Sequence, residues 1–171
     1  MDTNGIIRRL EANAPLFQAQ LHGVSDAQAR WKPAADQWSL LEVVAHLADE
    51  ELLDFRTRVD LALHRLGEVW PPIDPERWAT ERRYNEGDPG EALGRFVAER
   101  RRSVAWLDSL GVRDWAVAHA HPRFGPIRAG DLLASWLAHD LIHVRQMNRL
   151  HRAWLEATLA PDFMLEYAGR W

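Results

Sequence analysis

Residues 38–51 have the sequence WSLLEVVAHLADEE, which contains the clearest helix start in the chain. Ser39 and Glu42 form a capping-box pattern, in which the hydroxyl accepts an unpaired backbone N–H and the carboxylate reaches back to the cap. Apolar side chains then keep the spacing of an amphipathic helix as far as Gly67: Leu41, Val44, Leu47, Ala48, Leu52, Phe55, Val59 and Ala62. This stretch predicts one long helix with one buried face.

The same spacing predicts three further long helices, over residues 3–21, from 89 to about 111, and from about 129 to about 155. Pro15 should kink the first of them. Ser25 and Asp74 are expected to cap short helical turns, and Asp88, which precedes Pro89, is expected to cap the third long helix. Residues 112–127 are too rich in Pro and Gly for a helix and are expected to form a loop. The tail from residue 160 is expected to pack without regular structure.

Four long amphipathic helices in one domain, covering residues 1–171, predict an all-α four-helix bundle. The nine tryptophans are expected mainly as large apolar plugs in its core.

Composition narrows the classes of function. The chain has no cysteine, which excludes disulfides and thiolate ligands and leaves His, Asp and Glu to hold a metal. The net charge of −4 gives no electrostatic footprint for nucleic acid and no polybasic patch for a membrane. The amino terminus lacks a signal-peptide pattern and no apolar run is long enough to span a bilayer, so we expect a cytoplasmic protein.

Three histidines interrupt apolar helical stretches. His139 and His143 are four residues apart, so their side chains lie on one helix face, and His46 lies in the second helix. Such a pair is typical of metal sites, although chance alone supplies roughly 0.4 such pairs in a chain of this composition. Buried imidazoles can also be ordinary hydrogen-bonded core residues, and the spacing alone leaves both interpretations open.

A resemblance to a known protein family favours the metal-site interpretation of the three histidines. Residues 38–51, together with residues 121–127 and 131–146, resemble the two signatures of the DinB/YfiT-like superfamily, in the same order and at the same separation. The resemblance implies a four-helix bundle with a three-histidine metal site, whose ligands correspond to His46, His139 and His143. One departure is Arg128, which stands where these proteins often have a Thr or Ser cap, and we expect it to weaken the start of the fourth helix.

Three neutral imidazoles would leave a divalent metal with its full charge and an open position, as in catalytic sites. Zn or Ni is the leading expectation, with Fe or Mn as alternatives. Some members of the resembled superfamily use low-molecular-weight thiols. The expected function is therefore a metal-dependent transferase or hydrolase that activates a small thiol or water, with catalytic residues beyond the ligands unassigned.

The alternative function is a non-catalytic, metal-stabilised dimeric binding or interaction module. Trp70, Trp78 and Trp171 could then mark a partner surface. A homodimer is also expected by base rate and by the resemblance. A ferritin-like di-metal carboxylate site is disfavoured, because none of the three histidines follows a Glu at the required spacing.

Several other groups could contribute to the site. Asp49, Glu50 and Asp140 are expected mainly as solvated helix-face charges, and Glu50 is the best candidate to orient an imidazole. His119, His121 and Arg123 could line a pocket mouth, although an exposed loop is the favoured interpretation for them.

Overall fold

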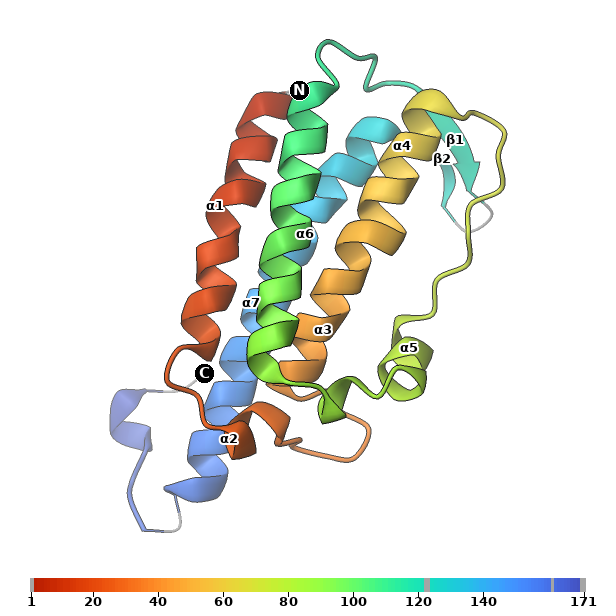
Figure 1. Ribbon diagram of the computed structural model, residues 1–171. Helices are drawn as coiled ribbons and strands as arrows, with labels where there is room; N and C mark the ends of the chain where they lie inside the picture. Colours follow the sequence, from red (N-terminus) through yellow and green to blue (C-terminus); the bar gives the residue numbers. More distant parts are fainter. Residues whose placement is uncertain (1, 122–123, 161, 170–171) are drawn as a thin grey trace.

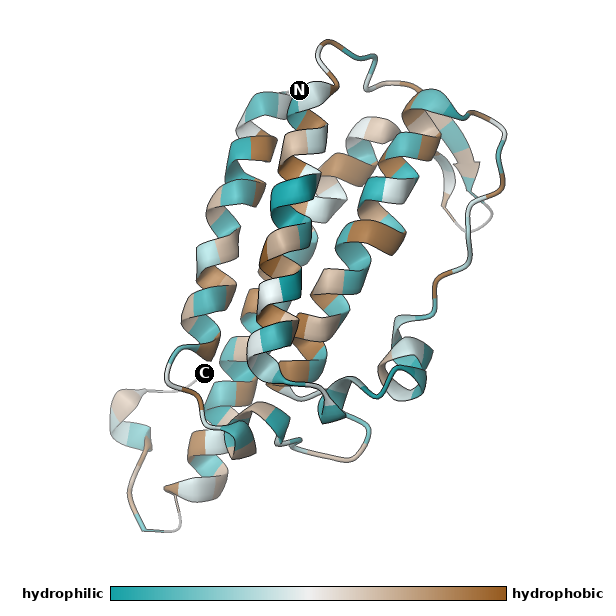
Figure 2. Cartoon of the chain, viewed as in Figure 1, coloured by the Kyte–Doolittle hydropathy of each residue, from teal (hydrophilic) through white to brown (hydrophobic). Residues whose placement is uncertain are grey.

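The computed structural model describes residues 2–121, 124–160 and 162–169. Four long helical segments lie side by side along most of their length (Figure 1). They are α1 (Thr3–Leu21), the continuous run of α3 (Leu40–Glu50), η1 (Glu51–Arg56) and α4 (Thr57–His64), α6 (Pro89–Ser109), and α7 (Ala129–Thr158). Each of them carries both hydrophobic and hydrophilic residues along its whole length (Figure 2), as amphipathic helices do. The predicted four-helix bundle is confirmed.

Short helical pieces connect the long ones: α2 (Asp26–Arg30), α5 (Pro75–Glu81), η2 (Tyr84–Glu86) and η3 (Glu166–Ala168). The predicted caps are present, since Ser25, Asp74 and Asp88 each accept a hydrogen bond from a backbone N–H three residues later. The first helix continues through Pro15 as one element.

The second long helix starts as predicted and then changes its winding. The Glu42 N–H donates to Ser39 Oγ at 3.1 Å and the Ser39 N–H donates to a Glu42 carboxylate oxygen at 2.8 Å. Residues Glu51–Arg56 form a π-helical segment, which the hydrophobic spacing gave no reason to expect. The Thr57 hydroxyl donates to the Leu52 carbonyl at 2.6 Å, so a side chain contributes to the hydrogen bonding of this segment.

We expected a loop over residues 112–127. The structure instead places a β-hairpin in the second half of this segment. Strand β1 (Ala118–His121) pairs with β2 (Gly125–Arg128) in antiparallel register, with His121 opposite Gly125. Gly125 has a φ of 72°, which a residue without Cβ adopts easily. The alternation of small and polar residues was too weak a signal to predict these strands.

The start of α7 is capped even though Arg128, and not a Ser or Thr, precedes the helix. The backbone N–H of Arg128 donates to Asp131 Oδ2 at 3.0 Å, and its guanidinium donates to the same carboxylate. The acidic residue therefore supplies part of what a Ser or Thr would have provided.

Trp136 is the one fully buried tryptophan in the described part of the chain, and the others there are partly exposed. Trp38, Trp70, Trp78, Trp106 and Trp115 are partly buried and pack against the core, so most tryptophans contribute to it as expected, although Trp136 alone of those described is fully enclosed. The expected packing of the tail is absent where it is described, because Phe163, Met164 and Tyr167 are exposed. Trp171 lies outside the described residues. Within those residues, no helix is long and apolar enough to cross a membrane.

Candidate functional site

Three imidazole nitrogens from two helices meet inside the bundle. The Nε2 atom of His46, on α3, lies 3.4 Å from Nε2 of His139 and 3.2 Å from Nε2 of His143, both on α7. The two nitrogens on α7 are 3.0 Å apart. His46 and His143 are buried and His139 is partly exposed. The structure thus brings together all three histidines singled out from the sequence.

A hydrogen bond defines the tautomer of His143. Its Nδ1 lies 2.7 Å from Oε1 of Gln146, and a carboxamide oxygen can only accept. Nδ1 of the neutral ring is therefore the donor, and Nε2 directs a lone pair toward the other two imidazoles. That orientation is the one a metal ligand requires.

The spacing of the nitrogens fits a tetrahedral metal ion. Nitrogen ligands lie about 2.0–2.1 Å from Zn²⁺, so two of them are about 3.3 Å apart at the tetrahedral angle. The three measured separations span 3.0–3.4 Å. Three histidines fill three of four positions, which leaves one for water or a substrate.

The surroundings keep the three rings neutral. Burial, followed by the neighbouring His143 and His139, lowers the pKa of His46 to about 2. Burial, followed by His143 and Arg100, lowers the pKa of His139 to about 3. Burial also lowers the pKa of His143. At neutral pH all three lone pairs are consequently available to a cation.

Glu50 lies directly behind His46 and is not solvated, which corrects the expectation of a helix-face charge. It is 4% exposed, and its Oε1 lies 3.8 Å from Nδ1 of His46. Neither atom has a hydrogen-bond partner in the described part of the chain. Burial, followed by the carboxylate of Asp54, raises the pKa of Glu50 to about 8. Glu50 thus lies beside the outward nitrogen of His46, beyond hydrogen-bond distance.

Asp49 is buried as well, but it lies away from the histidines. Its carboxylate accepts hydrogen bonds from Arg82, Tyr84 and Arg95. These contacts tie α3 to α6 and to the connection that precedes it, so Asp49 has a structural environment and the solvated interpretation is wrong.

Asp140 was also misjudged from the sequence. It is fully buried and accepts two hydrogen bonds from Arg100, at 2.8 and 2.7 Å, and one from Asn13 at 2.9 Å. Arg100 also donates to Glu51 at 2.9 Å. A signal was present, because Arg100 lies four residues after one core residue of α6, Phe96, and four before another.

His119 and His121 lie on the hairpin and away from the three histidines. The ring of Trp70 stacks on His119 with a centroid distance of 4.5 Å and lies 5.5 Å from His121. Neither histidine lines the cleft described next. Arg123 is outside the described residues.

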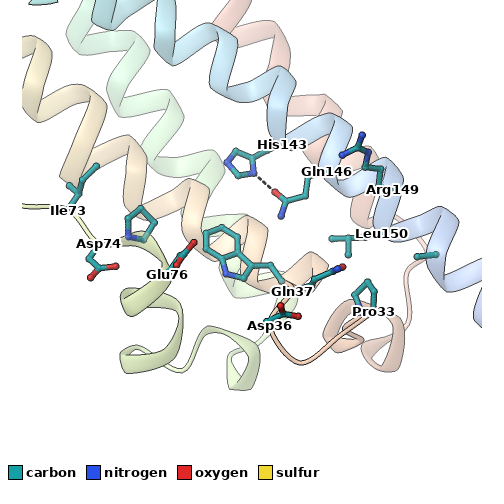
Figure 3. A pocket seen from close by; sticks show the side chains of 13 residues that line it. Pro33, Asp36, Gln37, Ile73, Asp74, Glu76, His143, Gln146, Arg149 and Leu150 are labelled. Atoms are coloured by element: carbon teal, nitrogen blue, oxygen red, sulfur yellow. Dashed lines mark hydrogen bonds between the residues drawn. The ribbon is translucent and has the colours of Figure 1, made fainter. Parts of the chain in front are cut away.

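A cleft of about 840 Å³ opens beside His143 (Figure 3). The ring of Trp38 forms part of its wall, parallel to the ring of His143 at 6.5 Å and 4.7 Å from that of His46. The rest of the lining comes from the 33–37 loop, the 73–76 segment and α7: Pro33, Asp36, Gln37, Ile73, Asp74, Pro75, Glu76, Gln146, Arg149, Leu150 and Ala153. Sequence reasoning identified none of this lining, because it comes from segments far apart in the chain.

Comparisons with known proteins identify a family and a shared fold. The family model described as the DinB superfamily matches residues 9–147, a range that contains all three histidines. Among solved structures, YfiT from Bacillus subtilis matches with a TM-score of 0.77 and 22% sequence identity, over 88% of this chain and 86% of that chain. It is described as a probable metal-dependent hydrolase with an unusual four-helix bundle topology. A search of curated proteins found no match. At this identity the structural likeness shows a shared fold.

Proposed function

Because the chain belongs to the DinB superfamily, we propose that it is a single-metal enzyme, a hydrolase or transferase acting on a small molecule. The proposed ligands are His46, His139 and His143. The observation that carries the proposal is the convergence of three neutral Nε2 atoms at 3.0–3.4 Å from one another.

The cleft favours catalysis over a purely structural metal. A structural site has four protein ligands and is closed, whereas this group offers three and one of them, His143, lines an open cleft. A small molecule in the cleft could therefore reach the fourth position. This feature argues against the alternative of a non-catalytic, metal-stabilised dimeric module.

A divalent ion held there would supply a Lewis acid that acidifies a water or binds a thiol. The residues of the chain have separate tasks. Gln146 fixes the ring of His143 by accepting a hydrogen bond from its Nδ1–H, and Trp38 covers His46 and His143 on the cleft side. Zn²⁺ or Ni²⁺ suits a set of imidazole ligands best, with Fe²⁺ or Mn²⁺ as alternatives.

Two reaction types are compatible with this site. Hydrolysis is supported by the description of the fold neighbour YfiT as a probable metal-dependent hydrolase. For transfer to a thiol, the thiol must arrive as a cosubstrate, because the chain has no cysteine. Both use the same three ligands and the same cleft.

The first test is metal content, measured on protein purified without a histidine tag. About one equivalent of a transition metal is expected in the wild type and none in His46→Ala, His139→Ala. His22→Ala is the matched control, since His22 is exposed and far from the site. Absence of metal from the wild type after reconstitution would refute the proposal.

The second test separates catalysis from structure. Small esters, amides and thiol–electrophile pairs should show turnover only with the loaded wild type. If the double variant loses thermal stability and no substrate turns over with the loaded wild type, the non-catalytic alternative holds.

A further inference from the structure

The cleft beside His143 is lined by an unequal set of charges. Three of its lining residues are acidic, Asp36, Asp74 and Glu76, and one is basic, Arg149. Figure 3 draws the side chain of Arg149 on the side of α7 away from the cleft. Arg149 also lines a second hollow, which is formed by residues of α7 alone. The cleft itself is therefore acidic.

Two of the three carboxylates have no partner of their own. Asp36 and Glu76 are exposed, and within the part of the chain that the structure describes neither accepts a hydrogen bond nor forms an ion pair. Asp74 is less available, because its carboxylate caps α5 by accepting the backbone N–H of Arg77 at 3.1 Å. Asp36 lies on the 33–37 loop and Glu76 at the start of α5, across the cleft from α7 (Figure 3). Both charges can thus attract a cation that enters there.

An aromatic surface accompanies these carboxylates. Trp38 lies two residues after Asp36, and its indole is part of the cleft lining. The face of an indole ring attracts cations, and recognition of ammonium groups by aromatic side chains rests on this attraction. Ile73 and Leu150 add apolar contacts for the uncharged part of a ligand.

The inner end of the same cleft indicates a ligand independently of these charges. His143 is 7% exposed and lines the cleft. Its Nε2 directs a lone pair toward Nε2 of His46 and of His139, 3.2 and 3.0 Å away, an arrangement that calls for a metal ion between them. A molecule whose reacting end lies at that ion would extend along the cleft toward the acidic rim.

The positive charge of the ion is compatible with a cation at the rim. A chain of several carbons between the two ends of the molecule keeps its ammonium group about a Debye length, roughly 8 Å, from the ion. Asp36 and Glu76 are exposed on that rim, so they act on the nearer charge.

We propose that Asp36, Glu76 and the indole of Trp38 form a subsite for an ammonium group, so that the substrate is a small, positively charged amine. This inference rests on the proposed metal site, because the reacting end of the amine is placed at the three histidines. Asp36 and Glu76 determine specificity in this arrangement and take no part in the chemistry.

The test uses protein loaded with Co²⁺, whose visible absorption reports binding of a thiol to the ion without turnover. The probes are 6-aminohexane-1-thiol, 6-mercaptohexanol and 6-mercaptohexanoate, which share a thiol and a six-carbon chain and differ in the charge of the far end. At pH 7 the wild type is expected to bind the amine about fivefold more tightly than the alcohol, and the acid most weakly. The double variant Asp36→Asn, Glu76→Gln should bind the amine and the alcohol equally.

Glu11→Gln, Asp108→Asn is the matched control. It makes the same change in net charge at two exposed carboxylates outside the cleft lining, and it should keep the wild-type preference for the amine. Equal affinity of the wild type for amine and alcohol would overturn the ammonium subsite and leave the metal site intact. A preference for the amine that survives in Asp36→Asn, Glu76→Gln would overturn it as well, and so would the absence of a spectral response to all three probes. Failure of the wild type to take up Co²⁺ would refute the proposed function, and this inference with it.

Discussion

The carboxylate of Asp140 accepts two hydrogen bonds from the guanidinium of Arg100, at 2.8 and 2.7 Å, inside the bundle. Asp140 directly follows His139, so this pair holds α7 against α6 at the level of the metal site. Arg100 also contacts Glu51 and the carbonyl of Leu10, which extends the link to η1 and α1. All four long segments of the bundle thus meet at one buried guanidinium.

Replacing Arg100 should therefore destabilise the whole fold. Arg100→Met removes the cation that is paired with the buried carboxylates of Glu51 and Asp140, and we expect a loss of about 3–5 kcal/mol in the free energy of unfolding. Urea unfolding measures it. Arg102→Met is the control, because Arg102 is exposed and its pair with Glu99 should be worth less than about 1 kcal/mol. Equal losses in the two variants would contradict a central role for Arg100.

Removal of the metal should lower the melting temperature of the wild type. A ligand present at about 1,000 times its dissociation constant stabilises the folded state by about 4 kcal/mol. Chelation should therefore shift the thermal transition downward in the wild type but leave His46→Ala unchanged. His64→Ala, at an exposed histidine paired with Asp60, should respond to chelator as the wild type does. A chelator effect of the same size in His46→Ala would place the metal elsewhere.

The metal-free protein should lose stability as the pH falls below about 6.5, the ordinary pKa of histidine. The folded-state pKa values of His46 and His139 are about 2 and about 3, and that of His143 is also lowered. Between the folded and unfolded pKa values the unfolded chain binds more protons, so the free energy of unfolding decreases on acidification, by up to about 1.4 kcal/mol per pH unit for each histidine.

Glu50 opposes this trend, because its pKa is raised to about 8 and it holds a proton in the folded state that the unfolded chain releases above about 4.5. Burial raises the pKa of Asp54 as well, so the two carboxyls offset at most two of the three histidines and a decrease remains. Urea unfolding at pH 7, 6 and 5 measures the slope, and His46→Gln, His139→Gln should flatten it. A metal-free wild type whose stability is independent of pH in this range would be inconsistent with three buried neutral imidazoles.

Loss of the contact between Gln146 and His143 should weaken metal binding without removing a ligand. Gln146→Leu keeps a similar volume but no longer fixes the ring, and such changes typically cost 10–100-fold in metal affinity. Competition with a chromophoric chelator measures the dissociation constant. Gln20→Leu serves as the control, since Gln20 bonds Asn148 rather than a histidine. Unchanged affinity in Gln146→Leu would show that His143 is oriented by packing alone.

Much of the helical layout was predictable because the signals are local. Ser39 and Glu42 lie within one turn, and the hydrophobic spacing that follows them depends on neighbouring residues only. The same holds for the caps at Asp74 and Asp88. The grouping of His46 with His139 and His143 was suggested by the spacing of two of them and by the family resemblance, and the structure then placed all three nitrogens together.

The tertiary structure alone decided the features that depend on long-range contacts. The burial of Asp140 requires Arg100 from another helix, and the π-helical winding at Glu51 leaves no trace in the hydrophobic pattern. The cleft is assembled from the 33–37 loop, the 73–76 segment and α7, which are far apart in the chain. A sequence determines how each segment winds through interactions between near neighbours, but pockets and buried ion pairs exist only after distant segments have packed, so the site's ligands could be anticipated and its cleft could not.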